Sequence, residues 1–361
     1  MPIETPHSLV IFRAPAAQRG SVIIFVLGVI MLTAFLLTRL MDRAAVELAA
    51  ESKASSRTVM RQEAFSALEA SLAVLADYAA ADNGLHATEQ GWAKPLELMN
   101  YLPGAGLSVE VQVDDETGKL SLPTVDETVL RGYLDALGCP ATSLDDLVDA
   151  LQVWTKANYV SPGGDYSAED FAGEELHFKA PQRALRSFEE LRAIPASRKV
   201  FFDEDGHWND LGQRFVAGAS LFQYSASNVN SAQPEGMRAL GLDFGHIESL
   251  VFARETNRSS NAFYRSTGDI SGIFGKDAPP PAGMGADAIC LHLIVKVKKG
   301  SREYRLDVWA SPTGATATPT PPPQSDPAAE ATPQIPAKRT SPRNKVDSPF
   351  QILELRENLE T

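Results

Sequence analysis

Histidine, cysteine and serine motifs are the first places to look for chemistry in this sequence of 361 residues. No zinc-ligand spacing such as H-E-x-x-H links the scattered histidines His177, His207, His246 and His292. No G-x-S-x-G sequence marks a nucleophilic serine, and no catalytic Cys–His pair is indicated locally. We therefore expect that the protein is not an enzyme.

The only cysteines are Cys139 and Cys290, so the chain can form a single internal disulfide at most. Such a bond would persist in an oxidising compartment outside the cytosol. Two buried free thiols are the alternative, and the sequence leaves the choice between them open.

The longest apolar stretch follows Gly20 and reads VIIFVLGVIMLTAFLL from Val22, with no charge until Arg39. As a helix these residues span roughly 26 Å, which is close to the thickness of the hydrocarbon layer of a bilayer. No Pro occurs in this region, and after Gly28 no Gly occurs until Gly84. The pattern predicts one helix over 21–82 that crosses a membrane and continues through water.

The residues before this helix indicate processing rather than an ordinary secretory signal, since no clear A-x-A site follows the apolar core. Arg19 and Gly20 directly abut the helix, which resembles the type III leader of type IV pilins and of type II secretion pseudopilins. The resemblance implies that a prepilin peptidase cleaves after Gly20 and that the new Ser21 amine is methylated. Most members of that class have Glu at the fifth mature position, where this chain has Phe25. A plain single-pass anchor with an incidental Gly is the alternative.

The net charge of −13 suits a soluble, self-repelling domain and opposes a surface that binds phosphate. Arg13 and Arg19 favour a cytoplasmic N-terminus, although Arg39 and Arg43 on the other side weaken this bias. We expect a single-pass protein of the bacterial inner membrane, with its C-terminal domain in the periplasm.

Periodicity beyond the membrane predicts the remaining elements. Phe65, Leu68, Leu72 and Leu75 form an apolar stripe on which a sheet can pack. The alternating stretch 107–113 predicts a strand, followed by a turn over 114–119 and extended structure at 120–122. The acidic turn is predicted to be a solvated hairpin tip, with a metal site as the alternative.

The predicted fold class is α+β, in which the long N-terminal helix packs on an antiparallel sheet with a large inserted α-helical domain. The region 311–348 is rich in Pro, Thr and Ala, and we expect it to be disordered. The predicted boundaries are a leader at 1–20, the helix at 21–82, the first α+β part at 83–124, the insert at 125–275, strands at 276–310, the Pro-rich loop at 311–348 and a final strand at 349–361.

Taken in order, these features resemble the K-type minor pseudopilins of type II secretion systems, the general secretion pathway protein K family. The resemblance covers nearly the whole chain, but the Pro-rich loop is longer than the family needs. It implies the pseudopilin fold with its helical insert and a complex with the I-type and J-type minor pseudopilins at the tip of a filament built from the major pseudopilin. The segments that carry it are Arg19-Gly20, Phe25, 115–120, 147–154, 181–191, 228–232 and 350–357.

A tip position is compatible with the residue at Phe25. In a stack of such helices, a Glu at this position can neutralise the buried N-terminal ammonium of a neighbouring subunit. A buried charge left unpaired costs about 3–5 kcal/mol, so the pairing favours addition of subunits. Phe25 cannot form this pair; the alternative is that it only adds apolar length.

The resemblance also implies Ca²⁺ in the helical insert, and two acidic loops offer the oxygen ligands that Ca²⁺ prefers. The second loop contains Asp203 and Asp205 and begins like an EF-hand, but Trp208 stands where that loop needs Gly. We therefore favour the first loop, with a solvated acidic loop as the alternative. Its predicted ligands are Asp165, Glu169, Asp170, Glu174 and Glu175.

The segment 228–232 and the two helices after it also resemble the helix-hairpin-helix unit of membrane-anchored competence proteins that bind DNA. The hairpin in that unit needs a Gly-apolar-Gly turn with nearby Lys, whereas the turn at 241–245 carries Asp243 and no Lys. Because the negative charge of Asp243 repels phosphate, we interpret the unit as architectural and expect no nucleic acid partner.

Overall fold

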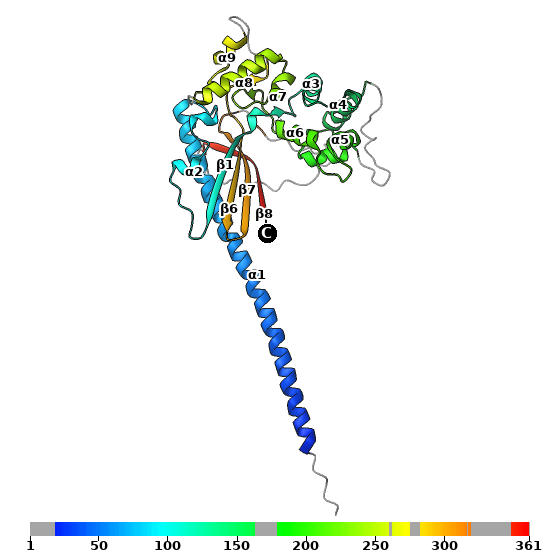
Figure 1. Cartoon of the computed structure of the whole chain (residues 1–361), viewed down its shortest axis with the longest axis vertical. Helices are drawn as coiled ribbons and strands as arrows, with labels where there is room; N and C mark the ends of the chain where they lie inside the picture. The colour runs from blue at the N-terminus through cyan, green and yellow to red at the C-terminus, as the bar shows by residue number, and fades with distance from the viewer. Residues whose placement is uncertain are drawn as a thin grey trace, which may run out of the picture. The chain divides into compact units, whose positions relative to one another are not determined.

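The computed structural model describes residues 19–162, 179–259, 262–274, 282–315, 317–318 and 348–360. The chain divides into two compact units, Met1–Val59 and Met60–Thr361. Helix α1, Arg19–Asp82, begins in the first unit and ends in the second (Figure 1).

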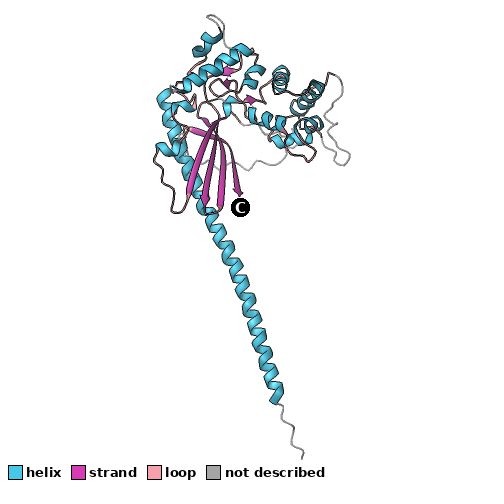
Figure 2. Cartoon of the chain, in the orientation of Figure 1, coloured by secondary structure: helices cyan, strands magenta, loops and turns pink. Residues whose placement is uncertain are grey.

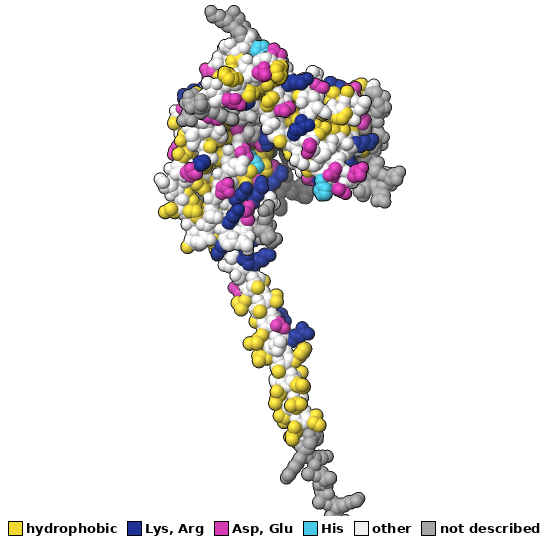
Figure 3. Space-filling view, in the orientation of Figure 1, with side chains coloured by type: hydrophobic (Ala, Val, Ile, Leu, Met, Phe, Trp, Pro, Cys, Tyr) yellow, Lys and Arg dark blue, Asp and Glu magenta, His cyan; other side chains and the backbone are white. Residues whose placement is uncertain are grey.

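Helix α1 confirms the predicted long helix and runs without a break for 64 residues. It ends at Asn83 and Gly84, which have φ values of 59° and 153°. The Gly84 N–H donates to the Ala79 carbonyl at 2.9 Å, as in the left-handed ends typical of helices. In the first unit, the side chains of 22–37 are exposed hydrophobic or small groups, seen as hydrophobic side chains along the helix in Figure 3. This stretch is long and apolar enough to cross a membrane.

The second unit is built on a four-stranded antiparallel sheet with the strand order β1-β6-β7-β8 (Figure 2). The predicted final strand is present as β8, which pairs with β7 and has a bulge opposite Trp309 and Ala310. The strands are β1 (Ser108–Asp115), β6 (Leu291–Lys299), β7 (Arg302–Pro312) and β8 (Phe350–Glu360).

One face of this sheet packs on the C-terminal part of α1, as the apolar stripe predicted. Met60, Ala64 and Leu68 of the helix are buried against alternate residues of the central strands, such as Val295 and Leu306. The other face carries the intervening polar and aromatic side chains, because successive residues of a strand point to opposite faces.

The predicted helical insert is present between β1 and β6 and lies at one end of the sheet (Figure 1). Its buried side chains form two apolar clusters, one around α3 to α6 and the other around α7 to α9. The second cluster includes Met284 and Ala286, so the insert continues past the predicted boundary at 275. The helices are α3 (Glu127–Ala136), α4 (Ala141–Thr155), α5 (Pro195–Phe201), α6 (Asp210–Gly218), α7 (Pro234–Ala239), α8 (Phe244–Ser259) and α9 (Thr267–Phe274); a short α2 (Pro95–Leu98) precedes the sheet.

The predicted solvated hairpin tip at 114–119 is wrong. Glu116 and Thr117 are buried, and the Thr117 hydroxyl oxygen accepts the backbone N–H groups of Ile289 and Cys290. The chain then enters β2, Leu120–Ser121, which pairs in parallel with β3, Ala219–Ser220, and not with β1. A local pattern of polar residues cannot reveal these long-range partners.

Part of the segment expected to be disordered belongs to the fold. Strand β7 continues to Pro312, Ser311 is fully buried, and Thr318 forms a β-bridge with Gln223. The Pro-rich residues 319–347 lie outside the described part of the chain.

Cys139 and Cys290 are both buried free thiols. Cys139 belongs to the apolar cluster around α3 to α6, whereas Cys290 packs with Phe222 and Tyr224 in a separate cluster. The structure therefore has the two buried thiols rather than the disulfide.

Gly118 lets the turn after β1 pack directly on the helical insert. A Cβ atom at this position would lie 2.8 Å from the backbone carbonyl carbon of Ser231. We expect Gly118→Ala to lower the free energy of unfolding by about 1–3 kcal/mol, because the backbone must move to relieve the overlap. The free energy would be measured by urea unfolding of the full chain in detergent.

Gly236 in α7 supplies a matched control, since a Cβ atom there meets nothing within 4 Å. Gly236→Ala should leave the stability unchanged or raise it by roughly 0.5–1 kcal/mol. Equal effects of the two substitutions would contradict the close approach at Gly118.

Candidate functional site

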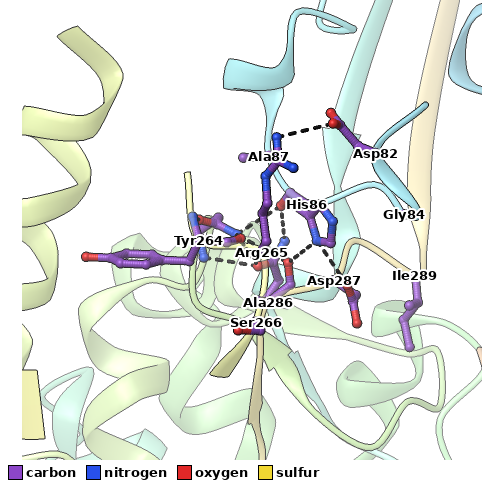
Figure 4. Close-up of polar contacts among 12 residues, drawn as sticks. Asp82, Gly84, His86, Ala87, Tyr264, Arg265, Ser266, Ala286, Asp287 and Ile289 are labelled. Carbon is purple, nitrogen blue, oxygen red and sulfur yellow. Dashed lines mark hydrogen bonds and ion pairs between the residues drawn. The ribbon is translucent and has the colours of Figure 1, made fainter. Parts of the chain in front are cut away.

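A buried polar cluster joins the sheet to the helical insert. It contains the segment after α1, the end of β1, the turn after β4 (Ser227–Asn228), the segment before α9, and the segment between β5 (Met284–Gly285) and β6. Figure 4 shows His86, Tyr264, Ala286 and Asp287 from these segments converging. We call this cluster the junction.

Asn228 connects two of the segments through its side-chain amide. The Nδ2 group donates to the His86 carbonyl and to Oδ2 of Asp115, each at 2.6 Å. Its Oδ1 accepts the backbone N–H of Asn230 at 3.0 Å. Because Asn228 is fully buried, these bonds replace the hydrogen bonds to water that its amide loses.

Asn230 extends the connection to two more segments. Its Nδ2 lies 2.9 Å from the Tyr264 carbonyl oxygen and 3.2 Å from those of Ala286 and His86, which share its two N–H groups. Its Oδ1 accepts the Tyr264 N–H at 2.9 Å. One carboxamide therefore satisfies backbone groups from three parts of the chain.

Asp115 closes the junction at the end of β1. Its carboxylate accepts hydrogen bonds from the Thr117 N–H, the Asn228 amide and the Ser231 hydroxyl. Burial raises the pKa of Asp115 to about 6, although each of these hydrogen bonds lowers it. Because all three groups donate hydrogen bonds to the Asp115 carboxylate, the junction stabilises its ionised form.

His86 has a buried ring that lies against an acid. Its Nδ1 is 3.0 Å from Oδ1 of Asp287 and 3.2 Å from the Ala286 carbonyl, so Nδ1 carries a proton. The hydrogen bond to Asp287 raises the pKa of His86, while burial opposes this rise. The ring stacks on Phe263 with centroids 5.8 Å apart. The junction thus holds chain segments together by hydrogen bonds and a charge pair.

The predicted calcium ligands Asp165, Glu169, Asp170, Glu174 and Glu175 lie outside the described residues, so the calcium site stays a prediction. Within the described ranges, no three His, Cys, Asp or Glu side chains lie close enough to hold a metal ion.

In the second predicted loop, Asp203 has an observed role in the turn. Oδ1 of Asp203 accepts the His207 N–H at 2.8 Å, and Phe202 pairs with Trp208 across the turn.

The helices of the predicted hairpin are present as α7 and α8, joined through Gly241 with a φ of 93°. Oδ1 of Asp243 accepts the His246 N–H at 2.9 Å, and this hydrogen bond lowers the pKa of Asp243. A carboxylate thus caps the backbone amide at the start of α8, where a phosphate would otherwise be attracted. The geometry favours an architectural role.

The residues predicted for processing and assembly lie near the start of α1. Gly20 and Ser21 are in its first turn, and the Phe25 side chain is 72% exposed. Sequence reasoning identified the segment 228–232 as a marker but missed its role at the junction. Two Asn residues separated by one apolar residue were the available signal, because buried Asn requires several partners.

Comparison with solved structures identifies the fold. A chain of the GspK–GspI–GspJ complex from the type 2 secretion system of enterotoxigenic Escherichia coli is similar, with a TM-score of 0.56 and 13% sequence identity. The match covers 86% of this chain and 99% of that chain. No family model and no curated protein matches the sequence.

These observations define an α+β pseudopilin fold, with a long N-terminal helix packed on an antiparallel sheet. Within that class, the fold is similar to that of a chain of the GspK–GspI–GspJ complex, as the sequence resemblance to the K-type implied.

Asn230 supplies a direct test of the junction. In Asn230→Asp, an oxygen replaces the Nδ2 that faces the carbonyls of His86, Tyr264 and Ala286, and a negative charge is buried beside these acceptors. We expect the free energy of unfolding to fall by about 3–5 kcal/mol in urea titrations of the full chain.

Asn358→Asp makes the same chemical change on exposed β8 and should alter stability by no more than about 0.5 kcal/mol. A similar small effect at Asn230 would contradict its role at the junction.

The charge pair of His86 and Asp287 makes stability depend on pH. The raised pKa of His86 means that its interaction stabilises the fold fully below about pH 6.5 and is lost as the pH rises through the folded-state pKa. We expect Asp287→Asn to reduce the gain in urea midpoint that the wild type shows between about pH 8 and about pH 6. The raised pKa of Asp115 acts in the same direction in both proteins and cancels in their difference.

Asp205→Asn, which changes an exposed acid of the turn at 203–207, should retain the pH dependence of the wild type. An unchanged pH dependence in Asp287→Asn would show that the pair does not form.

Proposed function

We propose that this chain is a K-type minor pseudopilin of a type II secretion system, a structural and interaction protein rather than an enzyme. The observation that carries the proposal is the large helical insert between two neighbouring strands of a pseudopilin sheet, in a chain that matches 99% of its solved counterpart. That counterpart forms a complex with GspI and GspJ. The proposed partners here are therefore I-type and J-type minor pseudopilins, beside the major pseudopilin.

In this proposal, α1 anchors the chain in the inner membrane and the unit Met60–Thr361 lies in the periplasm. The exposed apolar stretch of α1 supports the anchor, and the position of Gly20 in the first helical turn supports recognition by a prepilin peptidase. Cleavage after Gly20 removes the leader, and methylation of Ser21 follows. The filament that results pushes folded proteins through a pore in the outer membrane.

The proposed place of the chain is the filament tip, where it initiates or caps assembly. Phe25 presents an exposed aromatic ring where other subunits have a carboxylate, so it cannot neutralise the N-terminal ammonium of a further subunit. The bulk of the helical insert would also obstruct a subunit stacked above it. Both features favour the terminal position over an internal one.

Co-expression of the full chain with I-type and J-type pseudopilins and a prepilin peptidase tests the proposal. We expect the three pseudopilins to copurify from detergent-solubilised membranes, with the mass of this chain corresponding to a start at Ser21. Gly20→Glu should retain the leader, because the peptidase needs a small residue there.

Gly28→Ala is the matched control and should be cleaved normally, since a Cβ atom at Gly28 meets nothing within 4 Å. An intact Met1, a start beyond Leu37, or purification without either partner would contradict the proposal.

A further inference from the structure

A cleft lies between the outer face of the sheet, which points away from α1, and the part of the helical insert that includes 187–189, Trp208 and Val216 of α6. Its volume is about 350 Å³. Aromatic side chains from both sides line it, namely Phe188, Trp208, Phe222 and Trp309. Glu354 and Arg356 of β8 form one rim. The cleft is large enough for one aromatic side chain and has the aromatic lining that favours such a group.

The floor of the cleft is held in place by the neighbouring strands. The Trp309 ring stacks on His292 with centroids 4.1 Å apart and an angle of 3°. The guanidinium of Arg356 lies 5.0 Å from the centroid of the same ring. Asp307 holds His292 through a hydrogen bond of 3.1 Å and binds Arg305 at 2.8 Å.

The Asp307 carboxylate beneath this floor is ionised over the ordinary range of pH. Burial raises the pKa of Asp307, but the hydrogen bonds from His292 and Arg305 lower it, and the result is about 2. Asp307 therefore stays ionised and keeps its partners in place, so the floor does not have to reorganise to accept a ligand.

Strand β8 beside the cleft is an edge strand over its whole length of 11 residues. In the described ranges, β7 is the only strand that pairs with it. Such an edge offers backbone N–H and C=O groups to an extended segment of another chain. On the face toward α1, Ile352 and Leu355 are 41% and 38% exposed, so apolar side chains already mark that side of the edge.

The charges around Arg356 indicate which segment would fit. Lys296 of β6 and Arg305 of β7 stand directly opposite each other. Strand β8 is the next strand of the sheet beyond Arg305. Lys and Arg side chains gather over the sheet in Figure 3. Arg356 pairs with Glu354 on its own strand at 2.5 Å, so a carboxylate in an added strand opposite Arg356 would share its guanidinium with Glu354. A side chain two residues away, opposite Glu354, would point to the cleft.

We propose that β8 binds an extended segment of a partner protein as an added strand, with an aromatic side chain in the cleft and an acidic one opposite Arg356. The residue between them is apolar and lies beside Leu355. The segment thus has the pattern aromatic-apolar-acidic. This inference rests on the edge strand and the cleft, and it is independent of the assembly role proposed above.

The test uses the full chain in detergent and a synthetic peptide of about nine residues, a typical strand length. In the peptide, Phe and Glu are separated by one Val and flanked by alternating Thr and Val. We expect saturable quenching or enhancement of tryptophan fluorescence, and slower hydrogen exchange of the amides of residues 351–358. The same peptide with N-methylated backbone amides should not bind, because it cannot pair with the edge.

A charge exchange tests the chemistry at Arg356. Arg356→Glu should weaken binding of the Glu peptide by about ten-fold, and a peptide with Lys in place of Glu should recover most of that loss. Arg356→Gln should have an intermediate effect and serves if the reversed charge perturbs folding. Lys299→Glu, which reverses an exposed charge in the β6–β7 turn, should bind the Glu peptide like the wild type.

Three results would overturn the proposal. They are the absence of saturable binding, equal binding of the N-methylated peptide, and equal binding of both charge forms of the peptide to Arg356→Glu. Protection confined to 351–358, lost on N-methylation and reversed by the charge exchange, would support it.

Discussion

The structure of the second unit depends on the short distance between the two ends of the helical insert, which the sheet holds next to each other. The last residue of β1, Asp115, pairs with the first residue of β6, Leu291. The insert therefore begins and ends at one residue pair of an antiparallel ladder, in the place of a hairpin loop. Loop closure costs grow only slowly with length once the ends are fixed, so a long insertion is tolerated at this point. The Thr117 side chain reinforces the closure by hydrogen bonding the backbone C=O and N–H groups of Cys290, the residue before β6.

Closing the ends leaves backbone groups buried where several segments meet, and the Asn residues of the junction supply their partners. A hydrophobic side chain at Asn230 would fill the space but remove the hydrogen bonds that Asn230 makes to the carbonyl and N–H groups of Tyr264, which is costly in a buried site. This explains why polar residues occur between the apolar cluster of the sheet and the apolar cluster around α7 to α9. The junction gives the insert a fixed attachment to the sheet, which its apolar clusters alone would not specify.

Local signals in the sequence were enough to predict most of the elements. The absence of Pro and Gly predicted α1, Asn83 and Gly84 predicted its end, and alternation predicted β1, β6 and β7. The strand β8 was found because apolar residues return after the Pro-rich segment. The turn at 114–119 was misread because polar residues that are buried look the same in sequence as polar residues in water. The free thiols and the partners of Asn230 depend on contacts between distant segments, which no local pattern contains.

The two faces of the sheet obey different constraints. The inner face must match α1, and its alternate apolar residues are explained by that packing. The outer face has no such requirement, yet Lys296 stands opposite Arg305, an arrangement of like charges that lowers the stability of a strand pair. The ionised Asp307 offsets part of this repulsion by binding Arg305 on the same face. Arg305 therefore belongs to the polar network around Asp307 that orders the outer face beside the cleft.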